Sequence, residues 1–204
     1  MKTIVTIGRQ TGSGGREIGL QLAKKLDIPF YDKELLRKAA EKSGLCEKIF
    51  ENFDERPKSL LYSIAMDSYM FSLPGGGTSD SLEQQVYLAT FDTIQHLAAQ
   101  GPCVIIGRCA DYALRENPNV LRVFIDAPMD RRVQRESARL NLPEDKARAQ
   151  IVKTDKRRAS YYEYYSSQKW GSVDSYDLCL NSEKFGISGS VELLEKVIAV
   201  KESR

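Results

Sequence analysis

The sequence has little of what several common kinds of site require. It has one histidine and four cysteines, and the cysteines stand alone without the paired spacing of zinc ligands. We therefore expect reduced thiols, and we expect neither a disulfide framework nor a zinc site. The lone histidine, His96, lies near the end of a predicted helix, where a structural role is more common than a catalytic one.

Long apolar runs and an excess of one charge are also missing. No apolar run is long enough to span a membrane, and the sequence enters a predicted strand directly, without the pattern of a signal peptide. The net charge of +2 gives no footprint for nucleic acid. We expect a cytoplasmic, globular protein that binds neither membranes nor nucleic acid, folded as a single domain over residues 1–204. Whether it forms a homo-oligomer is left open.

The most informative stretch spans residues 3–26. Residues 3–8 have the β-branched composition of a buried strand, four glycines follow within residues 8–15, and helical spacing begins at Arg16. This order is typical of a phosphate-binding loop, because glycines let backbone N–H groups turn toward an anion at a helix N-terminus. The alternative is a glycine-rich turn that binds nothing. The predicted phosphate-binding residues are Gly12, Ser13, Gly14, Gly15, Arg16 and Glu17.

The loop matches the standard motif G-x-x-x-x-G-K-[ST] only in part. Aligning the motif on Gly14 puts Arg9 at the first glycine, Gly15 at the lysine and Arg16 at the hydroxyl residue. The backbone cradle is retained, but the cation that reaches the transferred phosphate is missing from its usual position. Arg16 could supply that charge, and so could Arg9.

Five predicted strands alternate with helices along the chain, which indicates an α/β fold with a five-stranded parallel sheet flanked by helices. Two inserts, at about 45–81 and 140–172, could swing over the site at the carboxyl ends of the strands. The predicted strands are 3–8, 28–31, 103–107, 121–126 and 176–181. The predicted helices include one from Asp32 to about Ser43, one begun by a capping box at Ser81, and one over 191–200.

Polar side chains follow two of these strands. Asp32 and Arg37, or its neighbour Lys38, lie at or just beyond the second strand. Arg108 and Asp111 follow the third, where an arginine fork and an acceptor carboxylate suit a nucleobase edge or a phosphate. The alternative for Arg108 and Asp111 is a mutual salt bridge that caps the next helix.

Arginines dominate the next two segments. Arg131, Arg132, Arg135 and Arg139 form a stripe on one predicted helix, which requires anions between them: phosphates, or the carboxylates of Asp130 and Glu136. The insert 140–172 is basic and suits a lid that closes over phosphates. Its four tyrosines, at 161, 162, 164 and 165, are expected to pack rather than to stack on a base.

Four motifs together resemble the cytidylate kinase-like family of P-loop proteins. They are residues 7–17, 30–34, 106–111 and 176–182, and the resemblance covers nearly the whole chain. It implies the fold of a P-loop nucleoside-monophosphate kinase, with a monophosphate-binding insert at 45–81 and a lid at 140–172. It also implies phosphoryl transfer from ATP with Mg²⁺ to a small molecule, with CMP or dCMP as the default acceptor.

The resemblance assigns roles residue by residue. The family's G-R-D segment falls on Gly107-Arg108, with the aspartate displaced to Asp111, and the loop lysine falls on Gly15. The implied catalytic residues are Arg16, Arg157 and Arg158. The implied acceptor-binding residues are Asp32, Arg37, Arg108, Asp111 and Asp155. No residue is assigned as a metal ligand, since Thr11 and Ser13 are only weak candidates in place of the usual loop hydroxyl.

Three hypotheses follow. The first is an ATP-dependent kinase of a nucleoside monophosphate. The second is a kinase on the same fold with a different acceptor, which the altered loop and the displaced aspartate permit. The third is a nucleotide-binding regulatory protein that kept the phosphate cradle and lost the lysine together with catalysis.

Overall fold

The structure, a computed structural model, describes residues 1–32, 38, 41 and 79–203. The described residues form a five-stranded parallel sheet with the strand order β2-β3-β1-β4-β5. The strands are β1 (Ile4–Arg9), β2 (Phe30–Tyr31), β3 (Val104–Ile106), β4 (Val120–Asp126) and β5 (Leu178–Asn181). Because the strands are parallel, their carboxyl ends meet at one edge, which is where α/β proteins bind ligands.

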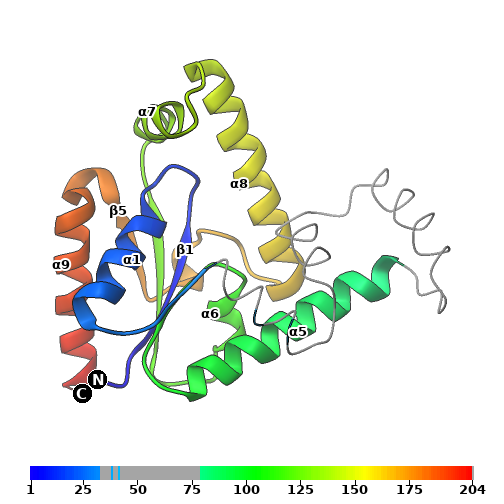
Figure 1. The fold of residues 1–204 in the computed structure, drawn as a ribbon, viewed down its shortest axis with the longest axis vertical. Helices are drawn as coiled ribbons and strands as arrows, with labels where there is room; N and C mark the ends of the chain where they lie inside the picture. Colours follow the sequence, from blue (N-terminus) through cyan, green and yellow to red (C-terminus); the bar gives the residue numbers. More distant parts are fainter. Residues whose placement is uncertain (33–37, 39–40, 42–78, 204) are drawn as a thin grey trace.

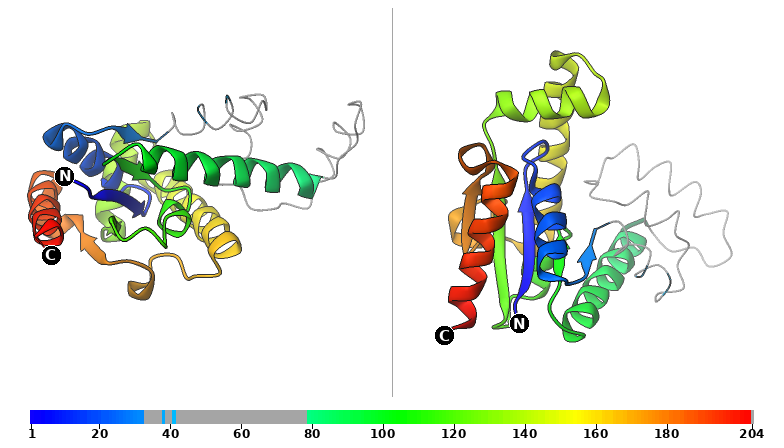
Figure 2. Two further views of the ribbon diagram at one scale, coloured as in Figure 1. Left: turned by 90° about the horizontal axis from the view of Figure 1, so that it is seen from below. Right: turned by 60° about the vertical axis from the view of Figure 1, so that its left-hand side comes forward.

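Helices cover both faces of the sheet (Figures 1 and 2). They are α1 (Gly15–Leu26), α5 (Ser79–Ala99), α6 (Ala110–Ala113), α7 (Met129–Leu140), α8 (Glu144–Ser166) and α9 (Ser182–Glu202), with a 3₁₀ turn η1 (Val173–Ser175). Helices α1 and α9 pack on one face, and α5 and α6 on the other. Helix α7 lies beyond the carboxyl ends of the strands, and α8 descends from it toward α5 (Figure 1).

The core explains why the central strands are apolar on both faces. Val5 and Ile7 of β1 are fully buried in the cluster with α1 and α9, whereas Ile4 is buried in the cluster with α5 and α6. Burying such side chains stabilises the fold by roughly 1.5–3 kcal/mol each. The rigid sheet therefore fixes the positions of the loops that leave its carboxyl edge.

The predicted sheet is confirmed. All five predicted strands are present, and their observed ends differ from the predicted ones by two residues or fewer. One face of α5 is buried against the sheet, at Val86, Thr90, Thr93, Ile94 and Leu97. Strands β1, β3 and β4 were predictable from sequence because a strand buried on both faces is almost continuously apolar.

The helix boundaries were predicted less well. Helix α5 begins at Ser79, so Ser81 lies inside the helix and the predicted capping-box start is wrong. Helix α9 begins at Ser182 rather than at 191, and Gly186 interrupts it with a non-helical φ of 65°. The residue Asn181 caps α9 by accepting a hydrogen bond from the Glu183 N–H, a local bond that apolar spacing does not reveal. The predicted helix after Asp32 and the insert up to residue 78 lie outside the described residues, apart from residues 38 and 41.

One ion pair joins β4 to the residue before β5 and gives a testable pH dependence. Asp177 accepts hydrogen bonds from the backbone N–H (2.8 Å) and the guanidinium (2.6 Å) of Arg122. Burial alone would raise the pKa of Asp177, but the bonds from Arg122 outweigh it and lower that pKa. A lowered pKa means that the folded state favours the carboxylate, so this stabilisation is present above the ordinary carboxyl pKa and is lost as pH falls through the lowered one.

We therefore expect Asp177→Asn to lower the melting temperature at pH 7 by about 2–4 °C. The difference from wild type should shrink steadily below about pH 4, where the wild-type carboxylate takes up a proton. Thermal unfolding followed by circular dichroism between pH 2.5 and 7 measures this. Asp174→Asn, at an exposed position three residues earlier, is the control. A destabilisation that is equal at every pH would contradict the ion-pair account.

Candidate functional site

The glycine loop joins β1 to α1 as predicted. Gly12 and Gly14 have φ angles of 76° and 81°, a left-handed conformation that glycine adopts most readily. Gly14 is the N-cap of α1 and has no side chain to cover the first N–H groups of the helix. A Cβ at Gly12 would lie 2.7 Å from the carbonyl oxygen of Arg132, so α7 packs directly on the loop. A loop of this shape at a helix start has the geometry that many anion-binding sites use.

Arg16 and Asp32, both predicted from the sequence, lie together. The Arg16 Nε atom is 2.6 Å from the Asp32 carboxylate, and the guanidinium lies 5.7 Å from the centre of the Phe30 ring. The Arg16 side chain is 59% exposed, whereas that of Asp32 is 11% exposed. Glu17 is also exposed and accepts a hydrogen bond from Gln21 one turn on. The ion pair between Arg16 and Asp32 therefore links the start of α1 to the end of β2.

Helix α8 reaches the loop through two of the predicted lid residues. Asp155 accepts a hydrogen bond from the backbone N–H of Thr11 at 2.8 Å and binds the Arg132 guanidinium at 2.5 Å. Arg158 donates to the carbonyl oxygen of Arg9 at 3.4 Å and to the Thr11 hydroxyl at 3.3 Å. The predicted lid is thus in contact with the loop, with one carboxylate on a loop N–H group.

The arginines of α7 were recognised from the sequence only as a stripe. Arg135 donates to the Gly12 carbonyl and to the Ser182 hydroxyl, both at 3.3 Å, and that hydroxyl donates to the Ser13 carbonyl at 2.5 Å. The carboxylates that neutralise the other three are Asp155 for Arg132, Glu183 for Arg131 and Glu136 for Arg139. Asp130, one of the predicted partners, instead binds Arg148. Spacing along the sequence placed these arginines on one helix, but it could not identify partners that lie on other helices.

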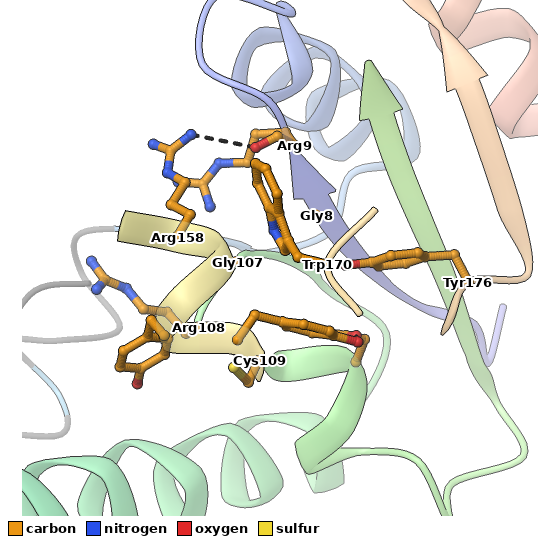
Figure 3. Close-up of a pocket in the computed structure, with 11 residues that line it drawn as sticks. Gly8, Arg9, Gly107, Arg108, Cys109, Arg158, Trp170 and Tyr176 are labelled. Carbon is orange, nitrogen blue, oxygen red and sulfur yellow. Dashed lines mark hydrogen bonds between the residues drawn. The ribbon is translucent and has the colours of Figure 1, made fainter. Parts of the chain in front are cut away.

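A pocket opens beside the loop at the carboxyl ends of β1 and β3 (Figure 3). Three arginines line it: Arg9 from the end of β1, Arg108 from the loop after β3, and Arg158 from α8. The remaining lining side chains are Cys109, Asp111, Tyr161, Tyr162, Trp170 and Tyr176. Trp170 and Tyr176 were not among the predicted site residues, and Arg9 was named only as a possible replacement for the loop lysine. The pocket thus combines cationic and aromatic groups, the chemistry that recognises a phosphate and a flat ring. Its volume of about 20 Å³ is too small for a nucleotide, so the pocket would have to widen to admit one.

The charges in this pocket perturb one another. Burial lowers the pKa of Arg108 to about 10, and the positive charges of Arg9 and Arg158 act in the same direction. Burial raises the pKa of Asp111, whose carboxylate accepts a hydrogen bond from the Tyr162 hydroxyl at 2.6 Å. Burial and the nearby Asp111 charge both raise the pKa of Tyr162. Concentrated like charge and perturbed groups in one pocket are typical of a functional site.

The remaining predicted residues have different outcomes. Arg37 lies outside the described residues, and the ammonium of Lys38 lies 4.8 Å from the centre of the Tyr31 ring. The Arg157 Nε atom is buried without a hydrogen-bond partner among the residues that the structure describes. Of the four tyrosines, Tyr161 and Tyr162 line the pocket, and Tyr162 is buried. Tyr164 is 66% exposed.

The sheet order, the glycine loop and the basic helices beside it define a P-loop protein with the fold of small-molecule kinases. The family model of the cytidylate kinase-like family matches residues 4–184. The chain therefore belongs to the cytidylate kinase-like family. The resemblance drawn from the sequence motifs is confirmed.

Two curated relatives are matched over nearly their whole length. The chain is 23% identical to a cytidylate kinase of Methanocaldococcus jannaschii, covering 96% of this chain and 97% of the relative. It is also 23% identical to a cytidylate kinase of Methanosphaera stadtmanae, covering 98% and 99%.

Solved structures show the same fold. An uncharacterized protein from Eubacterium ventriosum is 28% identical with a TM-score of 0.72, covering 97% of this chain and 99% of that one. Shikimate kinase from Bacteroides thetaiotaomicron is 16% identical with a TM-score of 0.56, covering 98% and 99%. In the described part of the chain, none of the helices is both long enough and apolar enough to cross a membrane.

Proposed function

We propose that this protein is an ATP-dependent kinase that phosphorylates a nucleoside monophosphate, with CMP or dCMP as the first candidates. The observation that carries the proposal is the pocket lined by Arg108 and Arg158, with Arg9 at its border with the glycine loop. Two anions must lie close together in such a reaction, and this edge of the sheet offers one cradle of N–H groups and one cluster of guanidinium groups. Membership of the cytidylate kinase-like family and the names of the two archaeal relatives support the choice of acceptor.

The loop would hold the phosphates of ATP. The left-handed Gly12 and Gly14 would turn loop N–H groups toward an anion, and the N-terminus of α1 adds partial positive charge. An anion would compete with the Gln10 carbonyl for the Ser13 N–H and with the Ser13 hydroxyl for the Gly15 N–H. Arg16 and Asp32 lie beside this helix start, and their ion pair would orient the residues that follow β2. These roles extend the sequence prediction for the loop and for Asp32.

The acceptor would lie at the arginine pocket, which would have to widen around it. Arg108 and Arg158 would bind its phosphate, and Tyr161, Tyr162 and Trp170 would contact its base or sugar. Asp111 accepts from Tyr162 and so positions that ring, rather than acting on the base directly. Arg37, outside the described residues, and Asp155 remain proposed acceptor-side residues from the family resemblance.

The reaction is a single displacement. A phosphate oxygen of the acceptor forms a bond to the γ-phosphorus, the bond from that phosphorus to the bridging oxygen breaks, and ADP leaves. Catalysis then consists of positioning the two anions and neutralising the charge in transfer, which Arg157 and Arg158 of α8 are suited to do.

The described residues contain no cluster of ligands that would hold Mg²⁺ without the help of phosphates. Among them, no group of three His, Cys, Asp or Glu residues is close enough together to hold a metal ion. The loop position that usually supplies a hydroxyl ligand is Arg16, and the Thr11 hydroxyl accepts from Arg158. We therefore expect Mg²⁺ to arrive on the phosphates of ATP.

A ligand panel tests the proposal. Melting temperature is measured with Mg-ATP, CMP, dCMP, UMP, AMP and GMP separately, and each stabilising monophosphate is then assayed for ADP production with ATP. We expect Mg-ATP and a pyrimidine monophosphate to raise the melting temperature, because ligands that bind only the folded state stabilise it. Stabilisation by ATP without turnover of any monophosphate would favour a different acceptor or a regulatory nucleotide-binding role. No response to any nucleotide would refute the kinase proposal.

A further inference from the structure

Gly15 occupies the position of the motif's lysine, and the structure gives a steric reason for the glycine. A Cβ built at Gly15 would lie 2.7 Å from the Cβ and 3.3 Å from the Cγ of Arg9, and 3.1 Å from the Cβ of Ile125. These atoms belong to the rigid, backbone-proximal part of each side chain, so they cannot swing aside. Gly15 is the first residue of α1, and it is absent from the glycines with positive φ. Space, rather than backbone conformation, therefore requires glycine here.

Arg9 occupies the position of the motif's first glycine, at the last residue of β1. Its side chain leaves the strand next to Gly15 and lines the pocket with Arg108 and Arg158. The Arg158 guanidinium contacts the Arg9 carbonyl, so the two residues are neighbours in space as well as in Figure 3. The charge of Arg9 also contributes to the lowered pKa of Arg108. Arg9 therefore places a cation at the pocket from the position of the motif's first glycine.

We propose that Arg9 replaces the missing loop lysine as the cation that contacts the donor's phosphates, and that Gly15 is glycine because Arg9 fills the space of a side chain there. The two departures from the standard motif, an arginine at position 9 and a glycine at position 15, are then explained together. The side chain that the motif places at position 15 is supplied from position 9 instead. This inference rests on the proposed function. It differs from the sequence-based preference for Arg16, whose guanidinium is 59% exposed and binds Asp32.

The steric half of the proposal is tested without any ligand. Gly15→Ala is introduced alone and together with Arg9→Gly, and thermal unfolding is measured for all four chains of the cycle. We expect Gly15→Ala alone to lower the melting temperature by about 2–10 °C, since overpacking a tight site is costly. In the Arg9→Gly background the loss should be less than half as large, because only the Ile125 contact remains. Equal losses in both backgrounds would overturn the coupling.

The functional half is tested by the affinity for Mg-ATP, measured by isothermal titration calorimetry. Arg9→Gly should weaken binding about 10- to 100-fold, the range expected for losing a charge-assisted contact. The double variant Arg9→Gly/Gly15→Lys restores the standard arrangement and should recover most of that affinity. Arg115→Gln is the matched control, because Arg115 binds Glu116 and stacks on Tyr112 outside the pocket.

The outcomes separate this inference from the proposed function. Unchanged affinity in Arg9→Gly, with a large loss in Arg16→Gln, would overturn the role of Arg9 and assign the cation to Arg16. In that case the kinase proposal would stand. If the wild-type protein binds Mg-ATP but phosphorylates no monophosphate, the proposed acceptor is wrong. The Mg-ATP affinities of the wild type and the Arg9 variants would still test the role of Arg9. A wild-type protein that does not bind Mg-ATP would overturn both.

Discussion

Replacing Arg158 with alanine is expected to lower kcat for phosphoryl transfer by about 10³-fold or more, the scale of losing an arginine that neutralises charge in transfer. Arg158 is the one pocket arginine that comes from the proposed lid, α8, and its guanidinium lies beside the loop. Its two bonds to the loop, at 3.3 and 3.4 Å, are long and therefore weak. The melting temperature of the variant is measured alongside, so that a loss of turnover is separated from a loss of folding.

The kinetics of Arg158→Ala are compared with those of Arg148→Gln on the same helix. Arg148 is 51% exposed and binds the exposed carboxylate of Asp130, so its loss removes one positive charge from α8 without touching the pocket. Steady-state assays with the acceptor identified in the ligand panel give kcat and KM for each variant. If Arg158→Ala kept kcat within threefold of wild type, or if Arg148→Gln lost as much, the proposed role of Arg158 would be wrong.

The sequence allowed a firmer prediction for Arg158 than for Arg9. Arg158 was predicted because the basic lid segment and the family resemblance both placed it near phosphates. Arg9 was only one of two candidates, because choosing between it and Arg16 requires the distance between a strand end and a helix start. That distance is set by packing against Ile125 of β4, which lies more than a hundred residues away in the chain.

The same division holds for the fold. The strands were predictable because burial on both faces demands continuous apolar runs, as in residues 103–107 and 121–126. The ends of α5 and α9 were not, since propensity changes little over one helical turn and local caps decide the boundary. Sequence spacing also placed the arginines of α7 on one helix but could not pair them with Glu183 of α9 or Asp155 of α8.

The pair that most clearly escaped prediction, Arg132 with Asp155, should dominate the stability of the loop region. Its two side chains are 8% and 16% exposed and 2.5 Å apart, and Asp155 also accepts from the Thr11 N–H. Removing one member of a buried pair leaves an uncompensated charge, which costs about 3–5 kcal/mol. We therefore expect Asp155→Ala to lower the melting temperature by at least about 6 °C.

A double variant distinguishes a buried charge from simple lost packing. Arg132→Met/Asp155→Leu removes both charges and keeps apolar volume, so it should be more stable than Asp155→Ala even though it changes more atoms. Arg139→Gln serves as the control on α7, because its guanidinium is 63% exposed and its partner Glu136 lies on the same helix. If the double variant unfolded at a lower temperature than Asp155→Ala, packing against the loop would matter more than charge. In that case shape rather than charge would hold α8 against the glycine loop, although a phosphate on the loop would still compete with the Asp155 carboxylate for the Thr11 N–H.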